Sequence, residues 1–401
     1  MSVMEEAEYS RLEYLPMLHS TENYDMILTE RGGGIWNLRT KKLLEYIGAK
    51  PEKMSAEVDP LFEWTANLMV INRRKTIVVV HAASRCSFVL HGMTVKHLKK
   101  LPEWILSGVR SVLEIEYVRQ EIVEQYLNDL GREVSFWANS SRKVVASCNK
   151  ACERVEWCSD LLEPENLLQQ GIQLWLNDDV LSGRDYLLAY QALVGQLQAR
   201  YGENIQACRA LELEVSLELY TPCKRRIIVP DNLNFYQFHN VLQECFGWKD
   251  CHLHQFVTAV DADGCPAEII QSDWEEETIP EVRVQNSTEV TLRDVFDSRE
   301  QIVYEYDFGD GWTHTISLCR IIEDYNEPYP HCILAVGDAP MEDCGGPDGF
   351  EYVRNVLKDP AHPEHREISE WVRSTWWQPL DVKRINYFLK NAHRKRAPII
   401  Y

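Results

Sequence analysis

The sequence predicts an α+β protein of two domains, in which the C-terminal domain is a mostly antiparallel sheet with flanking helices. Three observations lead to this class. The chain has 401 residues, which exceeds the usual length of a single domain. Residues 211–220 alternate strictly between apolar and polar side chains, as in an antiparallel strand with one solvated face. Residues 95–130 and 186–201 instead repeat apolar side chains with the period of a helix.

Composition and charge suggest where the domains begin and end. We expect a polar lead over residues 1–34, a small α+β domain over 35–158, a helical connector over 159–206 and a C-terminal α+β domain over 207–401. The formal net charge is -20, and about -16 of it falls within residues 211–401. This asymmetry favours two units with different surfaces.

The N-terminal elements follow from apolar spacing. Residues 40–47 have the pattern of a short amphipathic helix. Residues 64–71 and 76–81 are two β-branched runs around the polar tetrad 72–75, which predicts a hairpin, and residues 87–90 add a third strand. The first domain is therefore expected to combine a small sheet with helices.

The C-terminal elements begin with the alternating strand, whose solvated face carries Glu212, Glu214, Ser216 and Glu218. The remaining elements are expected in this order: an edge strand over 227–230, a helix capped by Asp231 or Asn232 and ending at Phe246, a strand over 252–257, a hairpin of 301–307 with 312–318, a loop over 331–350, and helices over 350–358, 364–377 and 381–394. Hairpin connections of this kind give antiparallel pairing.

Charge and apolar run lengths narrow the classes of partner. The chain has 62 Asp and Glu against 42 Lys and Arg, and such a surface repels nucleic-acid phosphate and anionic lipid. A protein or small-molecule ligand is therefore favoured over nucleic acid, and no membrane is expected, since no apolar run reaches the roughly 18 residues of a spanning helix. The acidic start has no signal-peptide pattern, so we expect a cytoplasmic protein whose twelve cysteines are mostly reduced.

The densest group of reactive side chains lies on the predicted hairpin. Residues 304–314 place Tyr306, Asp307, Asp310, Trp312 and His314 on two strands and a tight turn. Trp312 and His314 fall on one face of the second strand, because side chains two residues apart align. The structural interpretation is a well-formed turn, in which Asp side chains accept hydrogen bonds from their own main chain.

A loop further along the chain carries more reactive side chains. Glu342, Asp343 and Cys344 precede Gly345 and Gly346, where the main chain can approach a ligand closely. The sequence therefore predicts a functional surface that combines this loop with the hairpin turn.

Two imidazoles, His252 and His254, are expected to share one face of a strand. Imidazoles and carboxylates are the usual ligands of zinc- or manganese-type ions, so a divalent metal is a candidate cofactor. The same groups also serve as general acids and bases. The candidate metal ligands are Asp307, Asp310, His314, Glu342 and Asp343, with His254 as an additional ligand or base.

Five ordered blocks of sequence carry a family resemblance. They are KRRIIVP at 224–230, FGWKDCHLHQF at 246–256, TL at 291–292, YEYDFGDGWTHTI at 304–316 and APMEDCGGPDGF at 339–350. From Leu213 to about Leu389 the chain resembles the plasmid pRiA4b ORF-3-like family. The resemblance implies an intracellular α+β domain of bacteria or archaea with no settled activity, whose members also accompany insertion elements.

The C-terminal part departs from the family pattern at three places. The N-terminal part of the chain has a separate resemblance. Lys224 stands where the family usually has Trp, Met341 replaces a second proline, and residues 261–264 replace a Tyr-Gly hairpin, so the rim of any pocket can differ. The N-terminal part resembles a small uncharacterised bacterial domain, and that likeness supplies no function.

Three functions remain open at this point. The first is an accessory or binding protein, for which Trp248, Trp274 and Trp312 are candidate exposed aromatics. The second is a metal-dependent enzyme of hydrolase type. The third is a nucleic-acid-associated protein, suggested by the mobile-element association and by the basic stretch over 383–396 that includes most of the closing helix. Binding ranks ahead of catalysis, and the sequence leaves open whether the protein is an enzyme, which metal it holds and its oligomeric state.

Overall fold

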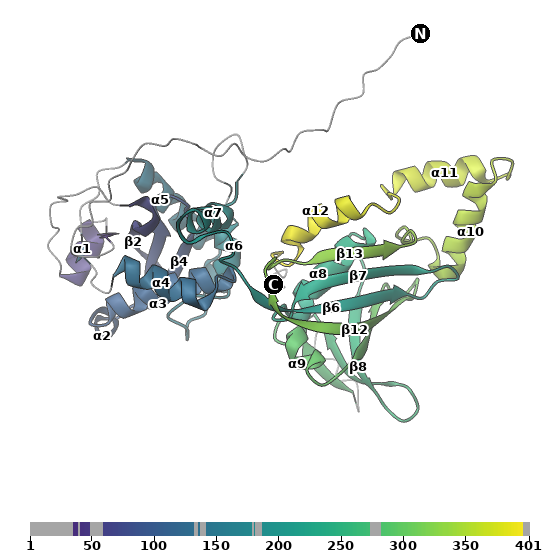
Figure 1. Cartoon of the computed structure of the whole chain (residues 1–401), viewed down its shortest axis with the longest axis horizontal. Coiled ribbons are helices and arrows are strands. Elements are labelled where there is room, and N and C mark those ends of the chain that lie inside the picture. The colour runs from purple at the N-terminus through teal and green to yellow at the C-terminus, as the bar shows by residue number, and fades with distance from the viewer. Residues whose placement is uncertain are drawn as a thin grey trace, which may run out of the picture. The chain divides into compact units, whose positions relative to one another are not determined.

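The structure is a computed structural model. It describes residues 35–38, 41–48, 59–131, 135–136, 142–178, 180, 187–272 and 282–395. Within these ranges the chain forms two sheets, each with its own hydrophobic core and its own helices, so the α+β class is confirmed (Figure 1). The expected polar lead and Trp274 lie outside the described residues.

The N-terminal sheet has five strands in the order β4-β3-β2-β1-β5. They are β1 (Ile35–Leu38), β2 (Trp64–Ile71), β3 (Arg74–His81), β4 (Ser87–His91) and β5 (Ser135–Phe136). The predicted hairpin of β2 and β3 is confirmed, but its turn consists of Asn72 and Arg73 alone, with φ of 49° and 62°. Two-residue turns with positive φ match the twist of paired strands, so the expected four-residue turn was wrong and Arg74 begins β3.

Helices pack on both faces of this sheet. They are α1 (Lys41–Ile47), α2 (Val95–Leu98), α3 (Leu101–Ile115), α4 (Gln120–Leu130), α5 (Arg142–Trp157), α6 (Gln173–Asn177) and α7 (Ala189–Tyr201), with short 3-10 turns at Pro60–Phe62 and Ser159–Leu161. Leu193 of α7 shares a core with Trp64, and Leu176 of α6 shares one with Val78. The helices expected as a connector therefore contribute to this core, and we propose that the first domain extends to about residue 206.

The C-terminal sheet has eight strands in the order β10-β9-β8-β11-β12-β6-β7-β13. They are β6 (Cys208–Leu217), β7 (Cys223–Pro230), β8 (His254–Val260), β9 (Pro266–Gln271), β10 (Arg283–Asn286), β11 (Gln301–Tyr306), β12 (Trp312–Tyr325) and β13 (His331–Val336). Each described pairing except that of β9 with β10 is antiparallel, as predicted. The expected edge strand over 227–230 is wrong, because β7 pairs with both β6 and β13, and β13 occupies part of the expected loop.

One charged residue on the alternating strand is buried against expectation. Glu212 is only 2% exposed, since it forms ion pairs with Arg226 and Arg320, each at 2.5 Å. The polar face of β6 is thus covered by paired charges at this point rather than fully solvated.

Helices cover the C-terminal sheet and one of its edges. They are α8 (Phe235–Phe246), α9 (Leu292–Phe296), α10 (Gly346–Lys358), α11 (His365–Ser374) and α12 (Val382–Ala392). The cap of α8 is Asn234, whose side chain accepts from the Gln237 N–H, and not Asp231 or Asn232. Beside β13, the Asn386 amide of α12 accepts from the Cys332 N–H at 2.7 Å and donates to its carbonyl at 2.9 Å (Figure 1). This side chain satisfies edge groups that would otherwise be open to another strand.

Two further observations concern cysteines and membranes. No disulfide joins any of the twelve cysteines, all of which lie within the described ranges, and most of them are buried. None of the described helices combines the length and the apolar character needed to cross a bilayer.

Candidate functional site

The turn between β11 and β12 orients Asp307. This residue has φ of 54°, which Asp tolerates in turns, and it is 6% exposed. Its Oδ1 accepts hydrogen bonds from the main-chain N–H of Gly309 at 3.0 Å and of Asp310 at 3.3 Å. The other oxygen, Oδ2, lies 3.6 Å from Nε2 of His252. One oxygen therefore holds the turn and the second is directed to an imidazole.

Glu342 reaches the same imidazole from the loop that precedes α10. Its Oε1 accepts from the Lys249 N–H at 2.8 Å and from the Tyr306 hydroxyl at 3.1 Å, and Oε2 lies 3.7 Å from Nε2 of His252. Burial, and then the Glu342 charge, raise the pKa of the Tyr306 phenol, so it stays protonated and donates. Glu342 is 7% exposed. Among the described residues, the ion pairs of Asp307 and Glu342 are with His252 and not with a lysine or arginine.

His252 lies just before β8 and is faced by a third carboxylate. Oδ1 of Asp343 is 3.2 Å from its Nε2, and the Asp343 side chain is 73% exposed. The Nε2 atom is shielded from solvent and has no hydrogen-bond partner among the residues that the structure describes. We call His252, Asp307, Glu342 and Asp343 the carboxylate–histidine cluster. Its residues come from three separate chain segments and surround the Nε2 atom of His252.

The distances from His252 Nε2 to the carboxylates are close to those between metal ligands, and His252, Asp307 and Asp343 offer donor atoms that all lie within 4.8 Å of one another. With zinc–ligand bonds of about 2.0–2.1 Å, neighbouring donors in a tetrahedral site lie about 3.3 Å apart. The distances from Nε2 to the three carboxylates are 3.2, 3.6 and 3.7 Å. His252 can compensate at most one of the two buried carboxylates, Asp307 and Glu342, so a cation remains the natural partner of these groups.

Asp310, Gly345 and Gly346 hold the turn between β11 and β12 against the loop that precedes α10. They are not donors to the carboxylate–histidine cluster. Oδ2 of Asp310 accepts from the Gly345 N–H at 3.1 Å. A Cβ on Gly346 would lie 2.7 Å from the Asp310 carbonyl oxygen, which explains the glycine there. Cys344 is half-buried, and burial followed by the Asp310 charge raises the pKa of its thiol to about 12. This thiol is therefore protonated near neutral pH.

The structure does not bring His314 to the carboxylates. His314 and Trp312 are both fully buried on the inner face of β12, where the His314 ring contacts Phe246 and Trp248. Their shared face is confirmed by the alternating burial along β12. Burial lowers the pKa of His314 to about 3, and its place among these rings, away from the carboxylates, does not support the expected role as a metal ligand. Trp248 is 6% exposed, so neither it nor Trp312 is an exposed aromatic.

His254 belongs to a separate group of side chains. Its ring stacks on His239 with centroids 3.5 Å apart and planes 6° apart. His239 is hydrogen-bonded to Asp250 and to the Tyr304 hydroxyl, each at 2.8 Å. Although these donors lie close together, parallel rings cannot both direct their in-plane lone pairs at one ion about 2 Å away. Packing explains this group better than a metal does, and burial lowers the pKa of His254 to about 3.

His239 and Asp250 are not among the site residues predicted from the sequence. A signal for His239 was present, because it falls among the apolar positions of the helix that ends at Phe246. Asp250 lies in a family block but carries no spacing that marks it.

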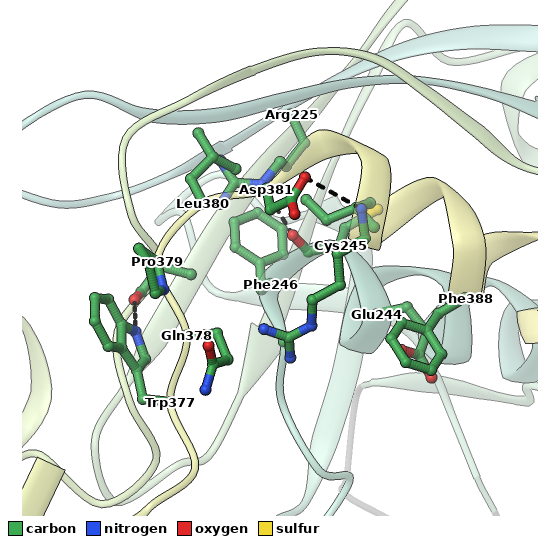
Figure 2. Close-up of a pocket in the computed structure, with 14 residues that line it drawn as sticks. Arg225, Glu244, Cys245, Phe246, Trp377, Gln378, Pro379, Leu380, Asp381 and Phe388 are labelled. Atoms are coloured by element: carbon green, nitrogen blue, oxygen red, sulfur yellow. Dashed lines mark hydrogen bonds between the residues drawn. The ribbon is translucent and has the colours of Figure 1, made fainter. Parts of the chain in front are cut away.

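A cavity of about 50 Å³ lies elsewhere in the domain and is lined by Arg225, Phe246, Trp377 and Arg384, among others (Figure 2). It has room for a few waters, whereas ligand pockets typically exceed about 300 Å³. The buried Arg225 guanidinium donates to main-chain carbonyls, including that of Cys245 at 2.9 Å. This arginine therefore ties the main chain together and is not available to a ligand.

Comparisons with known proteins give matches to two parts of the chain. Residues 209–386 match the family described as plasmid pRiA4b ORF-3-like protein, and residues 38–192 match a domain of unknown function, DUF6933. An uncharacterized protein of Sinorhizobium fredii, y4hQ, is 35% identical over 167 residues, which are 41% of this chain and 81% of that protein. A crystal structure of a protein of unknown function from Methanosarcina mazei Go1 matches with 29% identity and a TM-score of 0.38, covering 44% of this chain and 96% of that one. Through its C-terminal part, the chain belongs to the plasmid pRiA4b ORF-3-like family.

Proposed function

We propose that the C-terminal domain is a metal-centred binding module with an accessory role. In this proposal the DFGD loop (307–310) and the EDCGG loop (342–346) hold a divalent ion at the carboxylate–histidine cluster, and the ion receives a small-molecule or protein ligand. The observation that carries the proposal is the Nε2 atom of His252, which is shielded, has no hydrogen-bond partner within the described ranges and is faced by three carboxylates.

The burial of two carboxylates, Asp307 and Glu342, favours a bound cation. Asp307 and Glu342 are 6% and 7% exposed, and each uses one oxygen to accept hydrogen bonds from the surrounding loops. Removing a charged group from water is costly unless an opposite charge compensates it. A divalent ion supplies that compensation, and imidazole and carboxylate donors suit zinc- or manganese-type ions.

One side of the cluster is open to solvent. The Asp343 side chain is 73% exposed, and the neighbouring Leu253 and Phe308 are 52% and 49% exposed. An ion in the cluster can therefore be approached from the side of Asp343. An oxygen or nitrogen of a ligand would complete its coordination there, beside apolar side chains.

The same open side supports metal-assisted hydrolysis as a second candidate function. A water that reaches a bound zinc ion loses a proton near neutral pH and becomes a nucleophile. Turnover in a screen of ester, phosphoester and peptide substrates, abolished by His252→Gln, would place catalysis ahead of simple binding.

The test measures metal content and metal affinity. Tag-free protein, its His252→Gln variant and its Asp310→Asn variant would be compared by elemental analysis and by titration with zinc and manganese. We expect about one equivalent of metal in the wild type, little in His252→Gln, and normal binding in Asp310→Asn, whose side chain can still accept from Gly345.

The Asp310→Asn variant is the matched control, because it changes a charge in the same turn without removing a cluster donor. Metal that persists in a folded His252→Gln variant, or a wild type that binds neither ion, would refute the proposed site.

A further inference from the structure

A thiol lies beside the carboxylate–histidine cluster. Cys251 immediately precedes His252 and is exposed. Its Sγ, a ring nitrogen of His252 and a carboxylate oxygen of Glu342 all lie within 4.8 Å of one another. This thiol, imidazole and carboxylate form a second donor set, which shares His252 and Glu342 with the cluster.

A hydrogen bond to Tyr306 holds the main chain at Cys251, and the sulfur lies near the same hydroxyl. The Cys251 N–H donates to the Tyr306 hydroxyl at 3.3 Å, and the same hydroxyl is bonded to Glu342. The sulfur lies 3.9 Å from that hydroxyl. Because the residue is exposed, core packing does not account for its side chain, in contrast to a buried thiol such as Cys245.

We propose that Cys251 is a ligand of the ion and makes the site select zinc-class ions over magnesium, calcium and manganese. This inference rests on the proposed function. With zinc–sulfur bonds of about 2.3 Å and zinc–nitrogen bonds of about 2.0–2.1 Å, sulfur and nitrogen donors of a tetrahedral site lie about 3.6 Å apart. The observed donors lie within 4.8 Å of one another, so each pair would need to approach by about 1.2 Å at most to reach that spacing.

The selectivity follows from ligand chemistry. Thiolate is a soft donor that favours zinc and cobalt, whereas sites built from carboxylates alone suit magnesium, calcium and manganese. On binding, the Cys251 thiol releases its proton to solvent, and an electron pair of the sulfur forms the bond to the ion, with no change of oxidation state.

Cobalt(II) provides a spectroscopic test on the full chain. A cobalt–thiolate bond gives an intense near-ultraviolet charge-transfer band, whereas bound cobalt gives weaker visible bands whatever its ligands. The wild type, Cys251→Ser and the control Cys265→Ser, which replaces another exposed cysteine, would be titrated with cobalt and with manganese.

We expect the charge-transfer band in the wild type and in Cys265→Ser, and its loss in Cys251→Ser. The cobalt affinity of Cys251→Ser should fall by roughly tenfold or more, with a much smaller change for manganese. A variant Cys251→Ala, checked by circular dichroism, separates loss of the ligand from loss of fold.

The two proposals fail in different ways. Visible cobalt bands without a charge-transfer band, or a band unchanged in Cys251→Ser, would overturn the role of Cys251 and leave the metal site intact. The absence of any cobalt binding would overturn the metal site, and the role of Cys251 with it.

Discussion

At the scale of single residues, His252 and His314 show how the surroundings of an imidazole decide its role. His252 is half-buried with its Nε2 directed to three carboxylates, whereas His314 is enclosed by aromatic rings. Desolvation disfavours the charged imidazole of His314 and lowers its pKa to about 3. The first is suited to bind a cation, and the second contributes to stability only while it is neutral.

The burial of His314 predicts a pH dependence of stability. Because its pKa in the folded state lies below the value of about 6.5 in an unfolded chain, its contribution is complete above that pH and is lost as the pH falls toward 3. Replacing it by Phe should reduce the slope of the unfolding free energy between pH 6 and 5 by about 1.4 kcal/mol per pH unit.

Urea denaturation of the wild type and of His314→Phe at several pH values measures this slope. Other buried histidines contribute equally to both proteins, so the difference isolates one group. Identical slopes in the two proteins would show that His314 does not titrate as its burial requires.

The residue chemistry of the site was only partly predictable from the sequence. Asp307 and Glu342 were singled out as candidates because a tight turn and a glycine-rich loop bring side chains and main chain close together, and the structure places both carboxylates beside His252. His314 was grouped with them because alternation identifies the face of a strand but not whether that face is covered. Only the packing of α8 over the sheet reveals that it is covered.

At the scale of elements, the cluster depends on contact between the DFGD and EDCGG loops. Gly346 has φ of 72°, and a Cβ there would meet the Asp310 carbonyl oxygen at 2.7 Å. Gly345 has φ of 89°, but the nearest atom to its Cβ would be 3.8 Å away. Both positions therefore disfavour a side chain conformationally, and only Gly346 also disfavours it sterically.

This difference predicts unequal effects of the same substitution. Gly346→Ala should lower the free energy of unfolding by roughly 2 kcal/mol or more and weaken metal binding, because it forces the loops apart. Gly345→Ala should cost about 1 kcal/mol, from its positive φ alone. Urea denaturation and metal titration of both variants test this, and equal losses at the two positions would contradict the steric explanation.

Elements with a strong local sequence pattern were predictable, but which strands pair with them in the sheet was not. The β11–β12 hairpin follows from alternation on both sides of a glycine-containing turn. The interior position of β7 does not, because β13, which pairs with it, lies in a stretch whose prolines and glycine suggested a loop. Strand order is decided by distant pairing, which local periodicity does not encode.

At the scale of the whole molecule, the described residues contain separate cores for the two sheets. One core draws its buried side chains from residues 211–392, and the others from residues 43–205. An ion bound by the carboxylate–histidine cluster contacts only the first of these regions. Metal binding should therefore stabilise the C-terminal domain selectively.

Calorimetry of the full chain with increasing zinc tests this selectivity. At a free zinc concentration about 100 times the dissociation constant, binding to the folded state adds about 2.7 kcal/mol. For a domain of this size that raises the midpoint of unfolding by roughly 5–10 °C. We expect two transitions, of which only one moves with zinc, and neither should move in His252→Gln. A single transition that moves as a whole would mean that the two cores unfold together, and a transition unaffected by zinc would mean that the cluster does not bind it.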